Sequence, residues 1–189
     1  MHHQMPGLNR RVFGGTLIWD TPIEGLSAGS SVDSEHPTGS IVGGPYTGTF
    51  STHPLYPYYF FGKYEHGRAM FAGEYNRIAV NAQVQFPGGP PEVIRSDHRA
   101  FYAMASYRIA EKLTGGLYYS SSIDRQAAFT SSRFQKDWAL SGRYDFNPFL
   151  YVKFEQHFVD GTEIGFSTSN NSNLKPNTRM TLLKIGVSF

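Results

Sequence analysis

The feature of this 189-residue sequence that most constrains its fold is an alternation of apolar and polar residues with a period of two. Between residues 137 and 146, one series is aromatic or apolar: Trp138, Leu140, Gly142, Tyr144 and Phe146. The intervening series contains Asp137, Ala139, Ser141, Arg143 and Asp145. Successive side chains of a strand point to opposite faces, whereas a helix would mix the two series around its circumference. The pattern predicts an all-β, antiparallel fold.

We expect nine strands, and we find no helical pattern long enough to compete with them. Their expected ranges are 11–20, 25–33, 55–65, 68–80, 98–109, 113–124, 134–146, 149–160 and 178–189. The connections between them alternate in length. Four are short turns ("TPIEG", "EHGR", "AEK" and "FNPF"), whereas residues 34–54, 81–97, 125–133 and 161–177 are long and rich in Gly, Pro, Ser, Thr and Asn. Short turns on one rim and long loops on the other are typical of a transmembrane β-barrel of the bacterial outer membrane.

Aromatic residues recur near the short-turn end of the expected strands. The series Trp19, Tyr64, Tyr107, Tyr144 and Phe189 has spacings of 45, 43, 37 and 45 residues, so one hairpin with its long loop is the repeating unit. Rings at a common depth suit a membrane–water interface, and we assign Trp138 to an interface as well. The alternative is core filling at strand ends in a soluble protein, but full charges on the opposite face of the same strands favour the membrane.

Charged residues occupy the polar series, and the alternation predicts that they line a lumen. A charge that faces lipid at mid-depth costs about 2–4 kcal/mol, so these side chains are expected to point inward. The expected pore-lining residues are Lys63, Glu65, Glu74, Arg108, Arg143, Asp145, Lys153, Glu155, His157 and Lys184. Arg143 and Lys153 flank a short turn and should lie at similar heights, with Lys184 on the next strand. These three basic residues form a ladder across neighbouring strands. The ladder either selects ions or belongs to a structural lattice of salt bridges, and the sequence leaves both open.

The last residues, "TLLKIGVSF", place Leu183, Ile185, Val187 and Phe189 on one face of a strand. This ending resembles the C-terminal signature of bacterial outer-membrane proteins, which the barrel-assembly machinery reads. The stretches "GGTLIWDTPIEGLSAGSSV", "FAGEYNR" and "DWALSGRYDFNPFLYVKFEQHFVDGTEIGF" resemble the C-terminal half of porin-like outer-membrane proteins, in the broad neighbourhood of phosphate-selective porins. No residue can be matched to a phosphate site.

The resemblance implies a barrel in the Gram-negative outer membrane that contacts lipid and passes small hydrophilic solutes or anions by passive diffusion. Porins are often trimers, so a homotrimer is one expected assembly, although nothing in the sequence marks an interface. Nine strands is an odd number, whereas bacterial single-chain barrels have even counts. We therefore expect the C-terminal part of a longer barrel, with residues 1–10 as a tail or truncated segment and residues 11–189 as the barrel segment.

Composition excludes several other classes. A net charge of +2 gives no strong electrostatic case for nucleic acid, and the absence of Cys removes thiolate metal sites and thiol nucleophiles. We expect no cofactor and no enzymatic activity. Two alternatives stay open. One is a surface enzyme with an Asp/His site at the loop-side rim, drawn from Asp97, His98, Asp124, Asp137, His157 and Asp160. The other is a plugged or adhesive barrel whose loops bind a partner.

Overall fold

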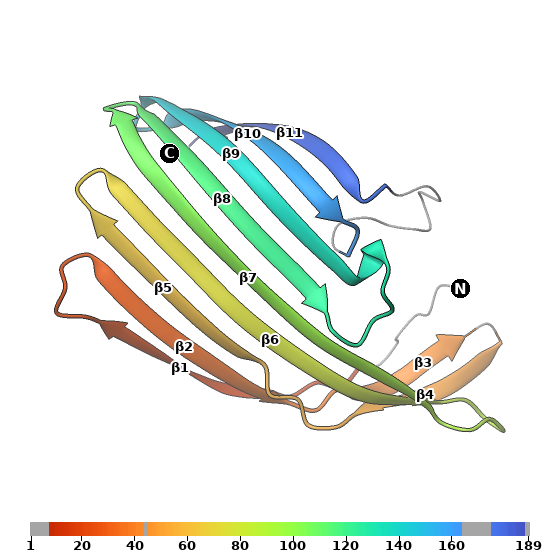
Figure 1. The fold of residues 1–189 in the computed structure, drawn as a ribbon. Helices are drawn as coiled ribbons and strands as arrows, with labels where there is room; N and C mark the ends of the chain where they lie inside the picture. Colours follow the sequence, from red (N-terminus) through yellow and green to blue (C-terminus); the bar gives the residue numbers. More distant parts are fainter. Residues whose placement is uncertain (1–7, 44, 164–174, 188–189) are drawn as a thin grey trace.

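The computed structural model describes residues 8–43, 45–163 and 175–187, which form one antiparallel sheet of eleven strands and a single short 3₁₀ turn. The first six strands are β1 (Val12–Asp20), β2 (Leu26–Glu35), β3 (Thr38–Gly43), β4 (Tyr46–Thr52), β5 (Tyr58–His66) and β6 (Ala69–Gln85) (Figure 1). The others are β7 (Glu92–Ala110), β8 (Leu113–Asp124), β9 (Phe134–Asn147), β10 (Leu150–Gly161) and β11 (Asn177–Val187), and the 3₁₀ turn is η1 (Ser131–Arg133). Among the described residues, no helix is long and apolar enough to cross a membrane.

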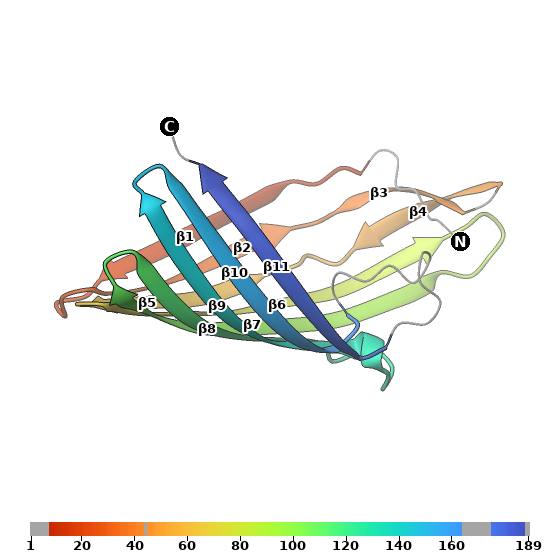
Figure 2. The ribbon, with the colours of Figure 1, turned by 90° about the horizontal axis from the view of Figure 1, so that it is seen from above.

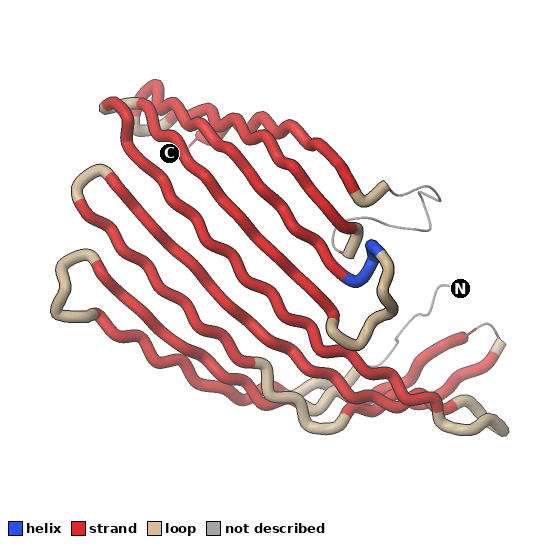
Figure 3. The backbone as a smooth tube through the Cα atoms, viewed as in Figure 1, coloured by secondary structure: helices blue, strands red, loops and turns tan. Residues whose placement is uncertain are grey.

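Nine of the strands form a continuous path in the order β1-β2-β5-β6-β7-β8-β9-β10-β11. These are the nine strands that the alternation predicts, so the all-β, antiparallel prediction is confirmed. The expected short turns connect β1 to β2, β5 to β6, β7 to β8 and β9 to β10, and Figure 3 shows them at one end of the sheet with the longer connections at the other. Seen from above, the sheet is curled (Figure 2), and within the described residues β1 and β11 are not hydrogen-bonded to each other.

Two strands lie where the sequence predicts a loop, so the count of nine is wrong for the described residues. β3 and β4 form a hairpin within residues 34–54, and Thr49–Thr52 of β4 pair with Gln85–Ala82 of β6. The predicted loop 81–97 is likewise mostly strand, because β6 runs to Gln85 and β7 begins at Glu92. Ile41, Ala82 and Val84 are buried in this region. Their contacts outweigh the low strand propensity of the surrounding Gly, Ser and Asn residues.

Part of the expected N-terminal tail contacts the sheet. Asn9 forms an isolated antiparallel bridge with Thr38, and its backbone N–H donates to the Thr38 carbonyl at 2.8 Å. The Arg10 guanidinium pairs with the Glu35 carboxylate, whose residue is 8 % exposed. These contacts fasten residues 9 and 10 to the loop end of the sheet. β1 itself begins at Val12, one residue from the expected boundary.

Burial separates the two faces of the curled sheet. Ala139 is 2 % exposed, whereas its neighbours Trp138 and Leu140 are 50 % and 55 % exposed. The register connects these positions across the sheet: Trp138 lies opposite Tyr119 and Phe158, and Ala139 lies opposite Tyr118 and His157. The more crowded face is the concave one, so the polar series points inward and the apolar series points outward.

The outward face presents a continuous apolar band. On β9, β10 and β11 its residues include Trp138, Leu140, Tyr144, Val152, Phe154, Phe158, Leu183, Ile185 and Val187. The predicted aromatics Trp19, Tyr64, Tyr107 and Tyr144 all face outward, each within three residues of the end of its strand at a short turn. They therefore lie at a common depth along this rim. Trp138 lies on the same face nearer the loop end, and Phe189 falls outside the described residues.

Gly25, in the turn between β1 and β2, is the first position at which we expect a measurable effect of mutation. Its φ is +78°, and a Cβ would lie 1.8 Å from the Glu65 carbonyl oxygen, which is part of the backbone. Gly25→Ala should therefore lower the free energy of unfolding by roughly 1–3 kcal/mol. Gly67 is the matched control, because its φ is +58° but no atom lies within 4 Å of its Cβ position. Urea unfolding in detergent micelles measures both variants, and equal losses would show that the contact with Glu65 is unimportant.

Candidate functional site

The inward face of the sheet carries all ten residues that the sequence predicts to line a pore. Their places follow from the strand register, which connects inward positions from β5 to β11. Between them stand many small side chains, among them Ala100, Ser120, Ser122, Ala139 and Ser141. Hollows of about 360 Å³ and 180 Å³ lie against this face. The inward surface is therefore both charged and open enough to be reached by water.

Basic residues of four strands share one row of the register. Arg143 lies directly opposite Lys153, and Lys153 lies directly opposite Lys184. On the other side of Arg143, Thr114 of β8 lies opposite Arg143 and also opposite Arg108 of β7. We call Arg108, Arg143, Lys153 and Lys184 the basic row. The Asn147–Pro148 turn sets the register of β9 against β10 and so fixes the central pair of the row.

Acidic residues neutralise part of the positive charge of the inward face, including that of Arg143 and Lys153 in the basic row. Three inward ion pairs join residues two apart on one strand: Lys63–Glu65 at 2.9 Å, Arg143–Asp145 at 2.7 Å and Lys153–Glu155 at 2.8 Å. The Arg143 guanidinium also lies 3.9 Å from the centre of the Tyr151 ring, a cation–π contact that limits its movement. In the part of the chain that the structure describes, no carboxylate lies within 4 Å of Arg108 or Lys184. The row therefore keeps a net positive charge.

A histidine–carboxylate pair lies beside the larger hollow. His157 Nδ1 and Asp137 Oδ2 are 2.7 Å apart, and both side chains are 13 % exposed. His157 Nε2 and Asp137 Oδ1 are buried and have no hydrogen-bond partner among the described residues. The hollow is also lined by Ser141, Lys153 and Glu155. The pair could hold a polar group of a passing solute, or it could take a proton from a water molecule.

A second polar cluster near the loop end was not predicted. Ser122 Oγ lies 2.9 Å from His98 Nε2 and donates a hydrogen bond to the Glu163 carboxylate, whose other oxygen lies 3.3 Å from the same histidine nitrogen. In a nucleophilic triad the carboxylate binds the other ring nitrogen, so this arrangement does not match one. The alternation could have placed His98 and Ser122 together. Glu163 lies in a connection whose path no sequence pattern specifies.

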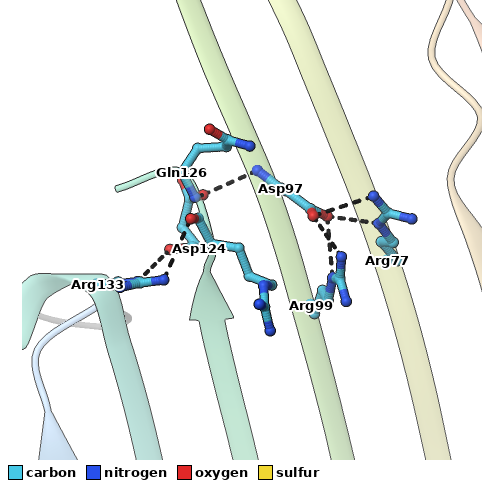
Figure 4. A network of polar contacts seen from close by, with 7 residues as sticks. Arg77, Asp97, Arg99, Asp124, Gln126 and Arg133 are labelled. Atoms are coloured by element: carbon cyan, nitrogen blue, oxygen red, sulfur yellow. Dashed lines mark hydrogen bonds and ion pairs between the residues drawn. The ribbon is translucent and has the colours of Figure 1, made fainter. Parts of the chain in front are cut away.

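The structure divides the residues of the predicted rim site between two faces. Asp97 and Asp160 point outward, where Asp97 pairs with Arg77 and Arg99 and Asp160 lies opposite Lys136. Asp124 Oδ1 accepts hydrogen bonds from the backbone N–H groups of Asp97 and Gln126, so it holds the end of β8 (Figure 4). Of the six candidates, the structure pairs Asp137 with His157. Because successive residues of a strand face opposite sides, two of the six carboxylate and histidine candidates point away from the lumen, and the rim enzyme stays a prediction for the others.

Comparison with known proteins identifies the fold. No family model and no curated protein matches the sequence. The structure of the NanC porin matches with a TM-score of 0.55 and 12 % identity, over 97 % of this chain and 98 % of that chain. Outer-membrane-expressed OmpT, from Vibrio cholerae, gives a TM-score of 0.43 and 13 % identity over 90 % of this chain and 62 % of that one. In-vitro folded OmpT, an outer membrane protein of the same organism, gives 0.43 and 14 % over 92 % and 62 %.

The likeness to NanC shows the fold. Together with the apolar outer face, it identifies the fold as that of a porin-like outer-membrane β-barrel, as the sequence resemblance implied. A barrel of this kind satisfies the backbone hydrogen bonds of strands that cross a lipid bilayer. The place of this chain is accordingly the outer membrane of a Gram-negative bacterium.

Proposed function

We propose that the chain forms a passive diffusion pore for small hydrophilic solutes and ions. The observation that carries the proposal is the division of the two faces: charges and small polar side chains point inward, and the outward band is apolar. A soluble barrel would bury its apolar series inside and expose its charges to water. Charges that point inward need a wet lumen, because an ionised side chain in a dry interior is strongly destabilised.

The basic row supplies a modest preference for anions in this mechanism. Its net positive charge raises the local concentration of anions in a narrow, water-filled passage, and rings of charged side chains filter ions in this way. The three inward ion pairs keep the preference small, because each places a carboxylate beside a cation. No chemical step and no cofactor is needed. Transport is limited by the width of the lumen and by its charge.

Single-channel recording tests the pore. The folded chain, reconstituted in a planar bilayer, is expected to give steady open steps whose size rises with salt concentration. A control recording uses the same detergent with heat-denatured chain. A barrel that is folded and inserted, as judged by protease resistance and electrophoretic mobility, but passes no current would contradict the proposal. That outcome would favour the plugged or adhesive barrel instead.

The Asp137–His157 pair supports a second candidate function, hydrolysis at a site in the lumen. Its unpartnered Nε2 beside a hollow of about 360 Å³ could act as a general base. Because we propose a pore, we expect His157→Gln to leave any background hydrolysis of ester and peptide probes unchanged. His66→Gln is the matched control, since His66 stacks on Tyr64 at the short-turn end of β5. A hydrolytic activity that only His157→Gln abolishes, with conductance retained, would establish the enzyme.

A further inference from the structure

The outward face carries a second charge pattern, directly above the apolar band. We follow the outward residues of each strand from its short turn towards the loop end. On β6, β7, β9, β10, β11 and β1, these residues are uncharged up to a position near the loop end. The first charged outward residues are Arg11, Arg77, Arg99, Lys136, Asp160 and Arg179. Asp97 follows two residues beyond Arg99. We call this set of seven residues the collar, and it contains five basic groups and two carboxylates.

The collar lies at one depth. The collar residue of β10 is Asp160, ten residues from the short-turn end of that strand at Leu150. The collar residue of β9 is Lys136, eleven residues from the short-turn end of that strand at Asn147. A tilted strand needs about 9–11 residues to cross a bilayer. The short turns of outer-membrane barrels are periplasmic. The collar therefore marks the extracellular boundary of the hydrocarbon layer.

Arg77, Asp97 and Arg99 of the collar are joined by hydrogen bonds (Figure 4). Arg77 and Arg99 lie directly opposite each other, an arrangement in which like charges repel. Asp97 relieves the repulsion, because its carboxylate accepts from Arg77 at 2.6 and 3.2 Å and from Arg99 at 3.4 and 2.7 Å. One carboxylate thus serves two guanidiniums. The two arginine side chains are 35 % and 34 % exposed, so both can reach a further anion.

Other collar cations lie near aromatic rings. Lys136 Nζ is 5.5 Å from the centre of the Phe134 ring, and the Arg179 guanidinium is 5.9 Å from that of Phe158. An aromatic ring beside a cation is typical of the boundary between hydrocarbon and headgroups, where the ring remains partly in lipid and the charge reaches water. The place of the collar outside the barrel means that it cannot filter a solute inside the lumen.

We propose that the collar binds the phosphate groups of lipid headgroups in the outer leaflet. Guanidiniums recognise phosphate through paired hydrogen bonds, and each basic residue near an anionic lipid surface adds to the attraction. The carboxylates of Asp97 and Asp160 lie within the collar and reduce its charge without cancelling it. The proposal rests on the placement in the membrane and not on the pore. An anionic lipid layer is the occupant that fits this position, this charge and the neighbouring rings of Phe134 and Phe158.

The test compares two triple variants that lose the same charge from opposite faces. The collar variant carries Arg99→Gln, Lys136→Gln and Arg179→Gln, which leaves Asp97 paired with Arg77. The lumen variant carries Arg143→Gln, Lys153→Gln and Lys184→Gln. The full chain in neutral detergent is titrated with phosphatidic acid, and the melting temperature is followed. We expect the lipid to raise the melting temperature of the natural chain and the lumen variant, with binding to the collar variant about fivefold weaker for each charge removed.

Three outcomes would overturn the proposal. The first is equal stabilisation by phosphatidylcholine, which would show that no anionic headgroup is recognised. The second is equal stabilisation by inorganic phosphate, which would make the collar a site for free anions. The third is unchanged binding by the collar variant, or by Arg179→Gln alone if the triple variant fails to fold. A folded barrel that passes no current but still binds phosphatidic acid through the collar would contradict the proposed pore function and leave the lipid proposal standing.

Discussion

Replacing Arg143, Lys153 and Lys184 together with glutamine is expected to shift the reversal potential in a salt gradient towards cation preference. The substitutions remove three of the four charges of the basic row and leave the carboxylates of Asp145 and Glu155 without their partners. A unit charge about 10 Å from an ion in water contributes roughly 0.4 kcal/mol, so three contribute about 1.2 kcal/mol, or roughly sevenfold in relative ion concentration. Screening at physiological salt reduces this to about two- to threefold.

The reversal potential is measured on single channels of each variant in a tenfold gradient of potassium chloride. Asp145→Asn with Glu155→Gln is the variant of opposite sign and should increase the preference for anions. The collar variant, which loses the same charge from the outer face, should leave the potential unchanged. An unaltered potential in the lumen variant, with normal conductance, would show that the row serves only as a structural lattice of ion pairs.

The position of the basic row could be predicted from the sequence. The alternation in residues 137–146 assigns Arg143 to the inward face, and the short turn at Asn147–Pro148 leaves β10 little freedom of register. Both are local constraints, so the sequence predicts the pairing of Arg143 with Lys153, and the structure has it. The common depth of Trp19, Tyr64 and Tyr107 follows in the same way from their distance to a short turn. The nine strands of the continuous path could be predicted because each of their hairpins is specified locally.

The structure of the loop end of the sheet could not be predicted, because it depends on residues that are far apart in sequence. β3 and β4 are rich in Gly, Ser and Thr, and their pairing depends on the buried contacts of Ile41 and Val84, which are far apart in sequence. The candidates for a rim site are grouped by their nearness to the loop end of the sheet, and not by the face to which they point. Asp97 and His98 are consecutive in one strand and therefore point to opposite faces. The predicted strand begins at residue 98, whereas β7 begins at Glu92, so the prediction places Asp97 in a loop and conceals this difference.

Leu140→Arg is expected to lower the free energy of unfolding by about 2–4 kcal/mol for the chain folded in phosphatidylcholine vesicles. Leu140 faces outward in the middle of the apolar band, opposite Leu117 on β8 and Gln156 on β10, and it is 55 % exposed. In a bilayer, that exposed surface contacts hydrocarbon. An arginine there has to lose its hydration or extend towards the headgroups, and both responses cost free energy.

Ser141→Arg is the matched control, because the next residue of the same strand points inward. Ser141 lies opposite Glu155 and beside the larger hollow, so an arginine would meet water and a carboxylate and should change stability by less than about 1 kcal/mol. Urea unfolding followed by tryptophan fluorescence and electrophoretic mobility measures both variants. In a soluble barrel the order would be reversed, since Leu140 would face water and Ser141 a dry core. The sign of the difference therefore decides which side of this sheet is wet, and a greater loss for Ser141→Arg would refute both the membrane placement and the pore.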